Sequence, residues 1–295
     1  MDYITLSNQA FIALGSSFIL ALLVILIVRT IMKNKSPNGL RKELAQKDNF
    51  AMGISYASTL FTVLVVTGFL FKNLSFTDIR ADTLYGILLM LFAFAYIHVG
   101  KNIHANFILK DFNEEKEIQH KNICAALVES GVMIGNGILI LGLYNWSHAQ
   151  SLDGLLILAV TFILLQVFMY LNSRWQEYAF SKANQGSSLQ NQFKFENISL
   201  GLRYGGQTLG TCLAIYAGLA SAAYFPGKMV ENLIMVAMQC GILIILQQFL
   251  SALAIRLALP KINTESEIDQ QDNIGIASIE LAIYIAVGLL LVKLF

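Results

Sequence analysis

Eight apolar segments, each about 20 residues long, divide this chain of 295 residues. A lipid bilayer offers no hydrogen-bond partners to the backbone, so segments of this length predict transmembrane α-helices, which satisfy their own backbone groups. The segments lie near residues 11–32, 50–71, 83–100, 123–144, 152–172, 198–222, 229–252 and 274–294. We therefore predict an all-α, polytopic membrane protein with eight transmembrane helices in contact with the lipid bilayer.

Composition excludes several other classes of protein. Only 13% of the residues are charged, against about 25% in a soluble domain, and the mean hydropathy is +0.62. The net charge of +1 gives no strongly basic surface, so we expect no nucleic-acid partner. The cysteines and histidines lack metal-ligand spacing, and no nucleotide-binding or hydrolase fingerprint occurs. We predict no metal site, no cofactor and no enzymatic activity.

Basic residues are distributed unevenly between the two predicted membrane faces. Fifteen Lys and Arg residues follow the odd-numbered segments, and four lie on the other side. Since cytoplasmic loops are enriched in Lys and Arg, both termini are expected on the non-cytoplasmic side. The basic loop 29–49 fits anionic lipid headgroups, although an ordinary orientation signal explains the same charges. Both interpretations stay open.

A pattern with a period of about 75 residues recurs four times along the chain. The stretches are "DNFAMGISYAS", "KNICAALVESG", "ENISLGLRYGG" and "DNIGIASIELA". In each, a charged residue precedes an asparagine and a small residue follows four positions later; the asparagines are Asn49, Asn122, Asn197 and Asn273, separated by 73, 75 and 76 residues. The pattern predicts four copies of a two-helix unit.

A second level of repetition appears seven positions after each asparagine. The residues there are Tyr56, Glu129, Tyr204 and Glu280, so the odd and even units alternate. Because each unit contains two crossings, successive units enter the membrane from the same side and the repeats are parallel. We predict two halves, 1–148 and 149–295, each of two hairpin units, related by a pseudo-two-fold axis.

The acids within the apolar segments are the strongest functional candidates. A charge within the membrane costs several kcal/mol unless it is paired or hydrated, so Glu129 and Glu280 are expected to face the bundle interior. Arg203 lies at a similar depth, and pairing with Glu129 or Glu280 is the structural alternative. Lys101 is expected to extend to the headgroups. Two deep acids and one deep base would leave one carboxyl to hold a proton or a cation.

The asparagine-plus-small pattern, repeated at about 75 residues across the chain, resembles the YjfL-like membrane proteins, the domain-of-unknown-function family numbered 350. This resemblance implies a multi-pass protein of the bacterial inner membrane, built from paired two-helix units. It implies no reaction. Tyr56 and Tyr204, which stand where the other units have Glu, leave open whether all four units act alike.

Two functions fit these features. The first is a proton- or cation-coupled transporter or channel, with protons or monovalent cations exchanging at Glu129 and Glu280, Arg203 as counter-charge, and Tyr56 and Tyr204 at the matching positions. The alternative is a non-transporting inner-membrane scaffold or envelope protein that recruits cytoplasmic partners. The buried acids favour transport and the glycine-rich packing favours a scaffold. Assembly into an oligomer is compatible with either function.

Overall fold

The structure is a computed structural model that describes the chain except for residues 1–7, 37, 73–78 and 148–151. Within the described residues the fold is all-α, without strands. The long helices are α1 (Asn8–Lys35), α2 (Phe50–Lys72), α3 (Ile79–Ile103), α5 (Ile123–Ser147), α6 (Leu152–Ala183), α8 (Ile198–Ser221), α9 (Met229–Ala258) and α11 (Ile274–Leu294). Short elements connect them: η1 (Lys42–Gln46), η2 (His104–Ile108), α4 (Glu114–Gln119), α7 (Leu189–Gln192), η3 (Phe193–Phe195) and α10 (Thr264–Asp269).

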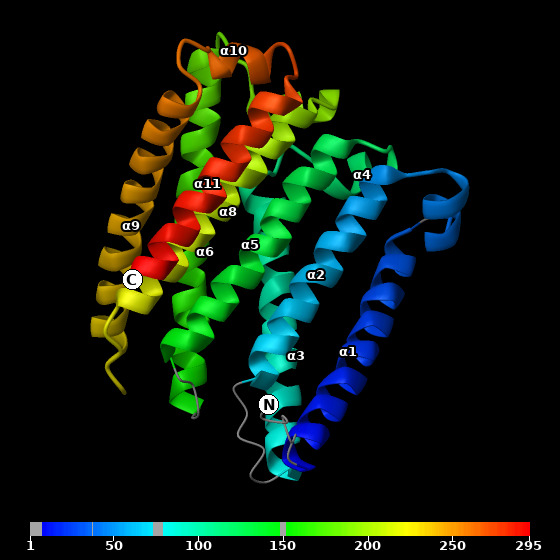
Figure 1. Cartoon of the computed structure of the whole chain (residues 1–295), viewed down its shortest axis with the longest axis vertical. Coiled ribbons are helices and arrows are strands. Elements are labelled where there is room, and N and C mark those ends of the chain that lie inside the picture. Colours follow the sequence, from blue (N-terminus) through cyan, green and yellow to red (C-terminus); the bar gives the residue numbers. More distant parts are fainter. Residues whose placement is uncertain (1–7, 37, 73–78, 148–151) are drawn as a thin grey trace, which may run out of the picture.

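The four helices that open on the repeated asparagines, α2, α5, α8 and α11, form a row in chain order, and we call them the motif helices (Figure 1). In this row α2 packs on α5, α5 on α8 and α8 on α11. The other long helices flank the row: α3 contacts α2 and α5, α6 contacts α5 and α8, and α9 contacts α8 and α11, while α1 contacts α2. The buried core lies along the row.

This row differs from the predicted pair of halves around a two-fold axis. An axis that carries α2 onto α8 and α5 onto α11 would convert the α5/α8 contact into a contact between α11 and α2. In the structure α2 and α11 are separated by α5 and α8 (Figure 1). The arrangement is therefore an open row with α2 and α11 at its edges. The predicted boundary between 148 and 149 lies outside the described residues.

Glycines explain how closely the motif helices approach one another. A Cβ atom on Gly131 of α5 would lie 2.7 Å from the Cα of Gly205 in α8. A Cβ on Gly206 of α8 would lie 2.8 Å from the Cα of Leu281 in α11. Since both contacts involve backbone atoms, a side chain at either glycine would force the helices apart. Small residues thus set the spacing of the row.

Six helical segments in the described part of the chain have the length and hydropathy of membrane spans; they lie in α2, α3 with η2, α5, α6, α9 and α11. They indicate a multi-pass membrane protein. The expected spans α1 and α8 are not among the six. For α8 the reason is physical: it carries Arg203, Gln207 and two threonines, and it lies between α5, α9 and α11, so its surface meets protein more than lipid.

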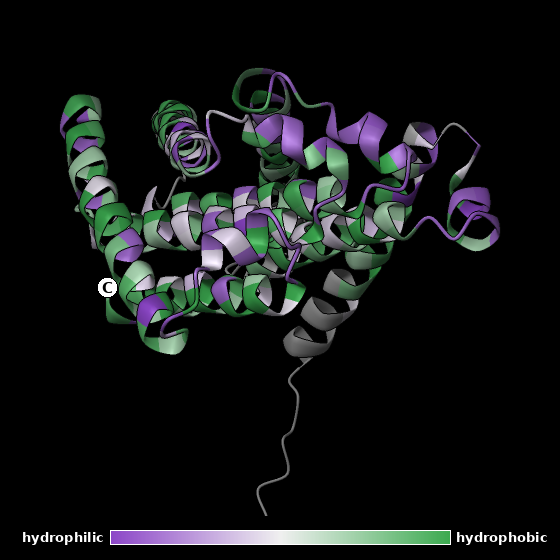
Figure 2. Cartoon of the chain, turned by 90° about the horizontal axis from the view of Figure 1, so that it is seen from above, coloured by the Kyte–Doolittle hydropathy of each residue, from purple (hydrophilic) through white to green (hydrophobic). Residues whose placement is uncertain are grey.

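The polar residues gather at one end of the bundle. Figure 2 views the end that carries α4 and α10, where hydrophilic residues cover the short helices and loops above largely hydrophobic long helices. The start of α1 and the end of α11 lie at the opposite end (Figure 1). The four motif helices therefore begin at the polar end and run in the same direction.

Candidate functional site

The repeated asparagines start the motif helices. In each case the side-chain Oδ1 accepts a hydrogen bond from the backbone N–H three residues later: Met52 for Asn49, Ala125 for Asn122, Leu200 for Asn197 and Ile276 for Asn273, at 2.8–3.2 Å. This is the geometry of a helix N-cap, which satisfies one of the free N–H groups of the first turn. The residue before each asparagine has a positive φ: Asp48, Lys121, Glu196 and Asp272.

Three of the asparagines also connect neighbouring motif helices through their Nδ2 groups. Asn49 donates to the carbonyl of Ile118 at 3.0 Å, Asn122 to that of Phe193 at 2.8 Å, and Asn197 to that of Ile268 at 3.0 Å. Each acceptor lies four or five residues before the next asparagine. One side chain therefore caps its own helix and holds the turn that precedes the next one.

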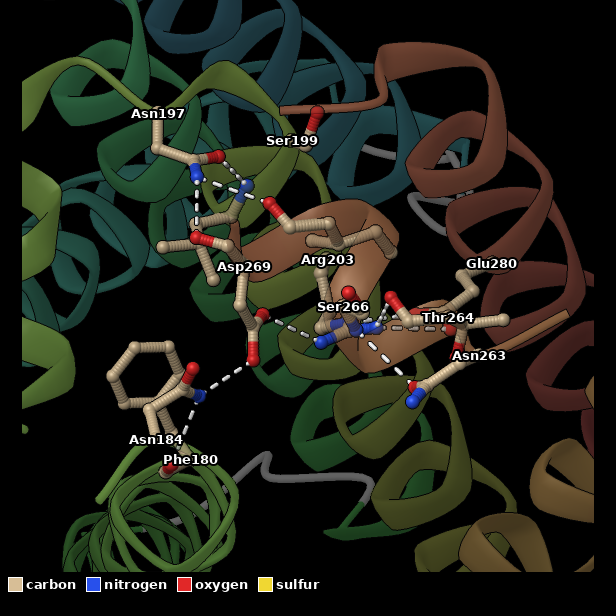
Figure 3. Close-up of polar contacts among 12 residues, drawn as sticks. Phe180, Asn184, Asn197, Ser199, Arg203, Asn263, Thr264, Ser266, Asp269 and Glu280 are labelled. Carbon is tan, nitrogen blue, oxygen red and sulfur yellow. Dashed lines mark hydrogen bonds and ion pairs between the residues drawn. The ribbon is translucent and has the colours of Figure 1, made fainter. Parts of the chain in front are cut away.

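Arg203 and Glu280 form the centre of a polar cluster between α8 and α11 (Figure 3). The Arg203 guanidinium donates to both Glu280 oxygens, from Nε at 2.7 Å and from Nη2 at 3.2 Å. Its Nη1 donates to Asp269 Oδ1 at 2.9 Å, and its Nη2 also donates to the Thr264 carbonyl at 2.9 Å. Asn184 Nδ2 donates to the second Asp269 oxygen at 2.7 Å. The cluster contains two carboxylates and one guanidinium.

The loop between α9 and α11 brings Asp269 over α8. Asn263 caps α10, accepting from the N–H of Ser266 at 3.2 Å, and Asp269 ends this helix four residues before Asn273. Its side chain is 2% exposed, whereas that of Arg203 is 15% exposed. Burial raises the pKa of the Asp269 carboxyl above its ordinary value of 3.8, although Arg203 acts in the opposite direction. Asp269 therefore holds a proton more tightly than a free carboxyl does.

Glu129 occupies a different pair, between α2, α3 and α5. Lys101 Nζ pairs with Glu129 Oε1, and Ser55 Oγ donates to Glu129 Oε2. The Glu129 side chain is 4% exposed. Two expectations from the sequence are therefore corrected: Lys101 reaches the bundle interior instead of the headgroups, and the two deep acids have two bases between them, Arg203 and Lys101, instead of one. The flexible stem of lysine allows either placement, and only the packing of α3 on α5 decides it.

The two acid sites share a register and differ in chemistry. Ser55 and Arg203 both lie six residues after their asparagine, and each contacts the Glu of the following motif helix. In the first site α3 supplies the base, Lys101. In the second site α8 supplies the base, and α9 lines the space beside Glu280 with Gln248 and Ala252. Lys101 lies 21 residues before Asn122, and the residue 21 positions before Asn273 is Ala252, which lines a cavity.

This cavity has a volume of about 280 Å³ and lies between α6, α8, α9 and α11 at the polar end of the bundle. Arg203, Gln207, Asp269, Glu280 and Tyr284 contribute to its lining. Gln176 of α6 lines it as well, and its buried amide nitrogen and oxygen have no hydrogen-bond partner among the described residues. An unpartnered buried amide is costly, so the site has the capacity to bind polar groups.

The tyrosines at the matching positions have separate environments. Tyr204 is buried and its hydroxyl lies 2.8 Å from His104 Nε2 and 3.2 Å from Ser173 Oγ. His104 Nδ1 in turn lies 3.5 Å from Glu114. Tyr56 is half-buried in α2 and packs against the hydrophobic core. The structure thus brings Arg203 to Glu280 and leaves Glu129, Tyr56 and Tyr204 in contacts of their own.

Sequence reasoning missed Ser55, Asp269 and Gln176, and it gave Lys101 no role in the site. Ser55 had a usable signal, since it stands at the repeat position of Arg203. Asp269 had a weaker one: it is an acid four residues before the asparagine, where the other stretches have Ala45, Ile118 and Phe193. Lys101 and Gln176 lie on flanking helices, whose alignment with the pattern does not follow from the asparagines. In the described part of the chain, no three His, Cys, Asp or Glu side chains come together as a metal site would require.

Comparison with known protein families assigns the chain to one of them. The family described as Domain of Unknown Function (DUF350) matches residues 5–144, 99–182 and 145–295. The chain belongs to the DUF350 family. The predicted resemblance is thereby confirmed. No curated protein and no solved structure matches the chain.

The two longer DUF350 matches adjoin at 144 and 145, and the third spans the junction from α3 into α6. Each longer match holds two motif helices, α2 and α5 in the first and α8 and α11 in the second. Family membership adds no substrate or reaction. Function must therefore be inferred from the arrangement of Arg203, Asp269, Glu280 and the cavity beside them.

Proposed function

We propose that this DUF350 protein is a proton- or cation-coupled transporter or channel in which the cavity beside Glu280 is the exchange site. The observation that carries the proposal is the polar cavity of about 280 Å³ that reaches Glu280 and Asp269. It joins two carboxylates, one guanidinium and the unpartnered amide of Gln176. A carboxylate in contact with a polar cavity exchanges a proton or a cation when its partner moves.

The two acid sites are assigned different roles in this proposal. Lys101 neutralises Glu129 at a site whose Glu side chain is buried, so we assign Glu129 to structure. Glu280 shares Arg203 with Asp269, which leaves one carboxylate in excess over the bases of the cluster. The excess carboxylate supports exchange of a proton or a monovalent cation at the second site.

We further infer that the chain contains four two-helix units in two halves, 1–148 and 149–295, and that all eight long helices cross the membrane. Four capping asparagines, four preceding residues with positive φ, and the shared register of Ser55 and Arg203 support this architecture. The two longer family matches support the halves. The units follow one another along the row and do not close around an axis.

The proposal places the protein in a bacterial inner membrane with the polar end and its basic loops in the cytoplasm. The start of α1 and the end of α11 lie at the same end of the bundle (Figure 1), which supports an even number of membrane crossings. The basic segment 29–49 is proposed to meet anionic headgroups there. In this orientation the cavity opens near the cytoplasmic face. We assign the protein no enzymatic step and no cofactor.

The test is ion flux in proteoliposomes, followed with pH- and potassium-sensitive dyes under an imposed potential. Glu280→Gln retains the Arg203–Asp269 pair, so the variant should fold and lose flux. The matched control is the double variant Lys101→Met/Glu129→Gln, which removes a buried base together with its acid and should keep flux. Flux that survives Glu280→Gln, or no flux in wild type for either ion, would reject transport and favour the scaffold.

A further inference from the structure

A buried histidine lies outside the polar cluster of Arg203, at the point where η2 begins. The carbonyl of His104 accepts a hydrogen bond from the N–H of Leu109, five residues later, so η2 is a π-helical turn. The His104 side chain is 4% exposed. Because each ring nitrogen of a histidine is a donor or an acceptor, a buried imidazole needs a partner on both sides.

The two ring nitrogens of His104 face an acid and a phenol. Nδ1 lies 3.5 Å from Oε1 of Glu114, the first residue of α4. Nε2 lies 2.8 Å from the hydroxyl of Tyr204 in α8, which in turn lies 3.2 Å from Ser173 Oγ in α6. The distance to Glu114 exceeds the usual hydrogen-bond range of about 2.7–3.2 Å. Among the described residues, neither buried atom of that contact has a hydrogen-bond partner.

The charge of the Glu114–His104 pair favours the binding of one proton. With Glu114 ionised and His104 neutral, the pair carries a negative charge on a side chain that is only 3% exposed. One added proton makes the pair neutral overall, either as an ion pair or as two neutral groups. Since an isolated buried charge is costly, this proton stabilises the pair. Because the two groups share the proton, they titrate as one unit.

The other charged groups around His104 have partners of their own. On α6, Arg174 donates to a backbone carbonyl of η2, and Glu177 accepts from a backbone N–H of α7 at 3.1 Å. One turn earlier on α3, Lys101 pairs with Glu129. The acid that faces the imidazole directly is therefore the one on α4.

Tyr204 connects this pair with the cavity of about 280 Å³. Its side chain lines the cavity together with Arg203 and Glu280, and its hydroxyl bonds His104. A proton can therefore pass in one balanced step: the Tyr204 hydroxyl gives its proton to Nε2 and takes another from water in the cavity. Tyr204 stands at the repeat position of Glu129 and Glu280. At this position the third unit reaches a titratable group on a neighbouring element.

We propose that Glu114 and His104 together form a second proton-binding site, which exchanges its proton with the cavity through the hydroxyl of Tyr204. The first site is the one proposed at Glu280. The use of this second proton in exchange rests on the transport proposal, whereas proton binding by the pair does not depend on it.

Nuclear magnetic resonance of the full chain in lipid bilayers, with ¹⁵N in the histidine rings, tests the site. The chain has four histidines, and His104→Gln identifies the His104 signals by their loss. Between about pH 4 and pH 9 we expect these signals to change from the neutral to the protonated form. Glu114→Gln should lower the midpoint by at least about one pH unit, because the opposite charge is removed. Glu115→Gln, at the exposed neighbour on α4, is the matched control and should leave the midpoint unchanged.

The route through Tyr204 is tested by the rate of proton exchange at His104. Tyr204→Phe removes the hydroxyl and keeps the ring that packs against Phe193. In this variant the line shapes of the His104 signals should show exchange at least about tenfold slower than in wild type. A purely structural hydrogen bond predicts no such change in rate.

Three results would overturn the proposal. The first is a His104 ring that keeps one protonation state over the whole pH range, as a purely structural imidazole does. The second is a midpoint that Glu114→Gln does not move, and the third is an exchange rate that Tyr204→Phe does not slow. If Glu114→Gln does not fold, the coupling is read in wild type, where the ¹³C carboxyl signal of Glu114 should titrate in the same step as His104. None of these readouts depends on flux, so failure of the transport proposal leaves the test unaffected.

Discussion

Arg203 Nε lies 2.7 Å from Glu280 Oε2, across the interface between two helices whose paired residues are 77 positions apart in the sequence. The same guanidinium holds Asp269 at 2.9 Å, so one base connects α8, α10 and α11. In the first half the equivalent position is Ser55, and the base comes from a flanking helix. One repeat position therefore carries two different chemistries, and the arginine version lies beside a polar cavity.

Removing this base should destabilise the protein. Arg203→Gln leaves Glu280 and Asp269 facing each other without a cation, and breaking a buried pair costs about 3–5 kcal/mol. The Arg203 side chain is 15% exposed, so we expect the lower end, about 3 kcal/mol. Unfolding in mixed micelles measures this free energy. Arg256→Gln, at an exposed residue of the same cavity, should change it by less than about 0.5 kcal/mol. Equal losses in the two variants would contradict the assignment.

Glycine contacts between the motif helices should be equally sensitive. In Gly131→Ala the new methyl group would lie 2.7 Å from the Cα of Gly205, a backbone atom, and overpacking of this kind costs about 1–3 kcal/mol. Gly241→Ala in α9 is the control, because no atom lies within 4 Å of its Cβ position. That variant should be neutral or stabilise the helix by about 0.5–1 kcal/mol. In thermal unfolding experiments in detergent, the midpoint temperature should fall for Gly131→Ala and should not fall for Gly241→Ala.

Replacing a capping asparagine by alanine should cost more stability where the asparagine amide also binds the neighbouring unit. Asn122→Ala removes an N-cap and the bond to Phe193, and its buried site leaves that carbonyl unpaired. A lost cap costs about 1 kcal/mol and an unpaired buried acceptor about 1–3 kcal/mol more. Asn273→Ala removes a cap and a bond to Glu267 within one loop, so about 1 kcal/mol is expected. The difference between the two variants in free energy of unfolding is the measurement. A larger loss at Asn273 would argue against the bridging role.

The elements that follow from local chemistry could be predicted from the sequence. Apolar length predicted the long helices, and the asparagines, which act within three residues, predicted where the motif helices begin. The pairing of Arg203 with Glu280 was one of two predicted alternatives. The sequence indicates how deep a residue lies along its helix, but it does not indicate which helix packs beside it. The order of the motif helices in the row could not be predicted from the sequence, since parallel units are compatible with either an open row or a closed pair.

The sequence also could not predict the contacts made by long side chains or by residues in loops. Lys101 has a stem that reaches either the headgroups or the interior, and the packing of α3 on α5 decides between them. Asp269 joins the site because α10 folds back over α8, a path that depends on the Asn263 cap and on Arg203 itself. The cavity appears only when the side chains of four helices are placed together.

Two buried carboxyls outside the membrane spans should respond to acid in opposite directions. Burial raises the pKa of Asp269 above 3.8, so the folded protein binds this proton more tightly than the unfolded chain, and stability rises as pH falls through the folded pKa toward 3.8. The hydrogen bond from Lys47 lowers the pKa of Glu43 below 4.5, so its contribution is full above 4.5 and is lost as pH falls through the folded pKa. Free energies of unfolding between about pH 3 and pH 7 test both. On acidification, wild type should gain stability relative to Asp269→Asn and lose stability relative to Glu43→Gln. Parallel curves for either variant would contradict the assigned direction of that group.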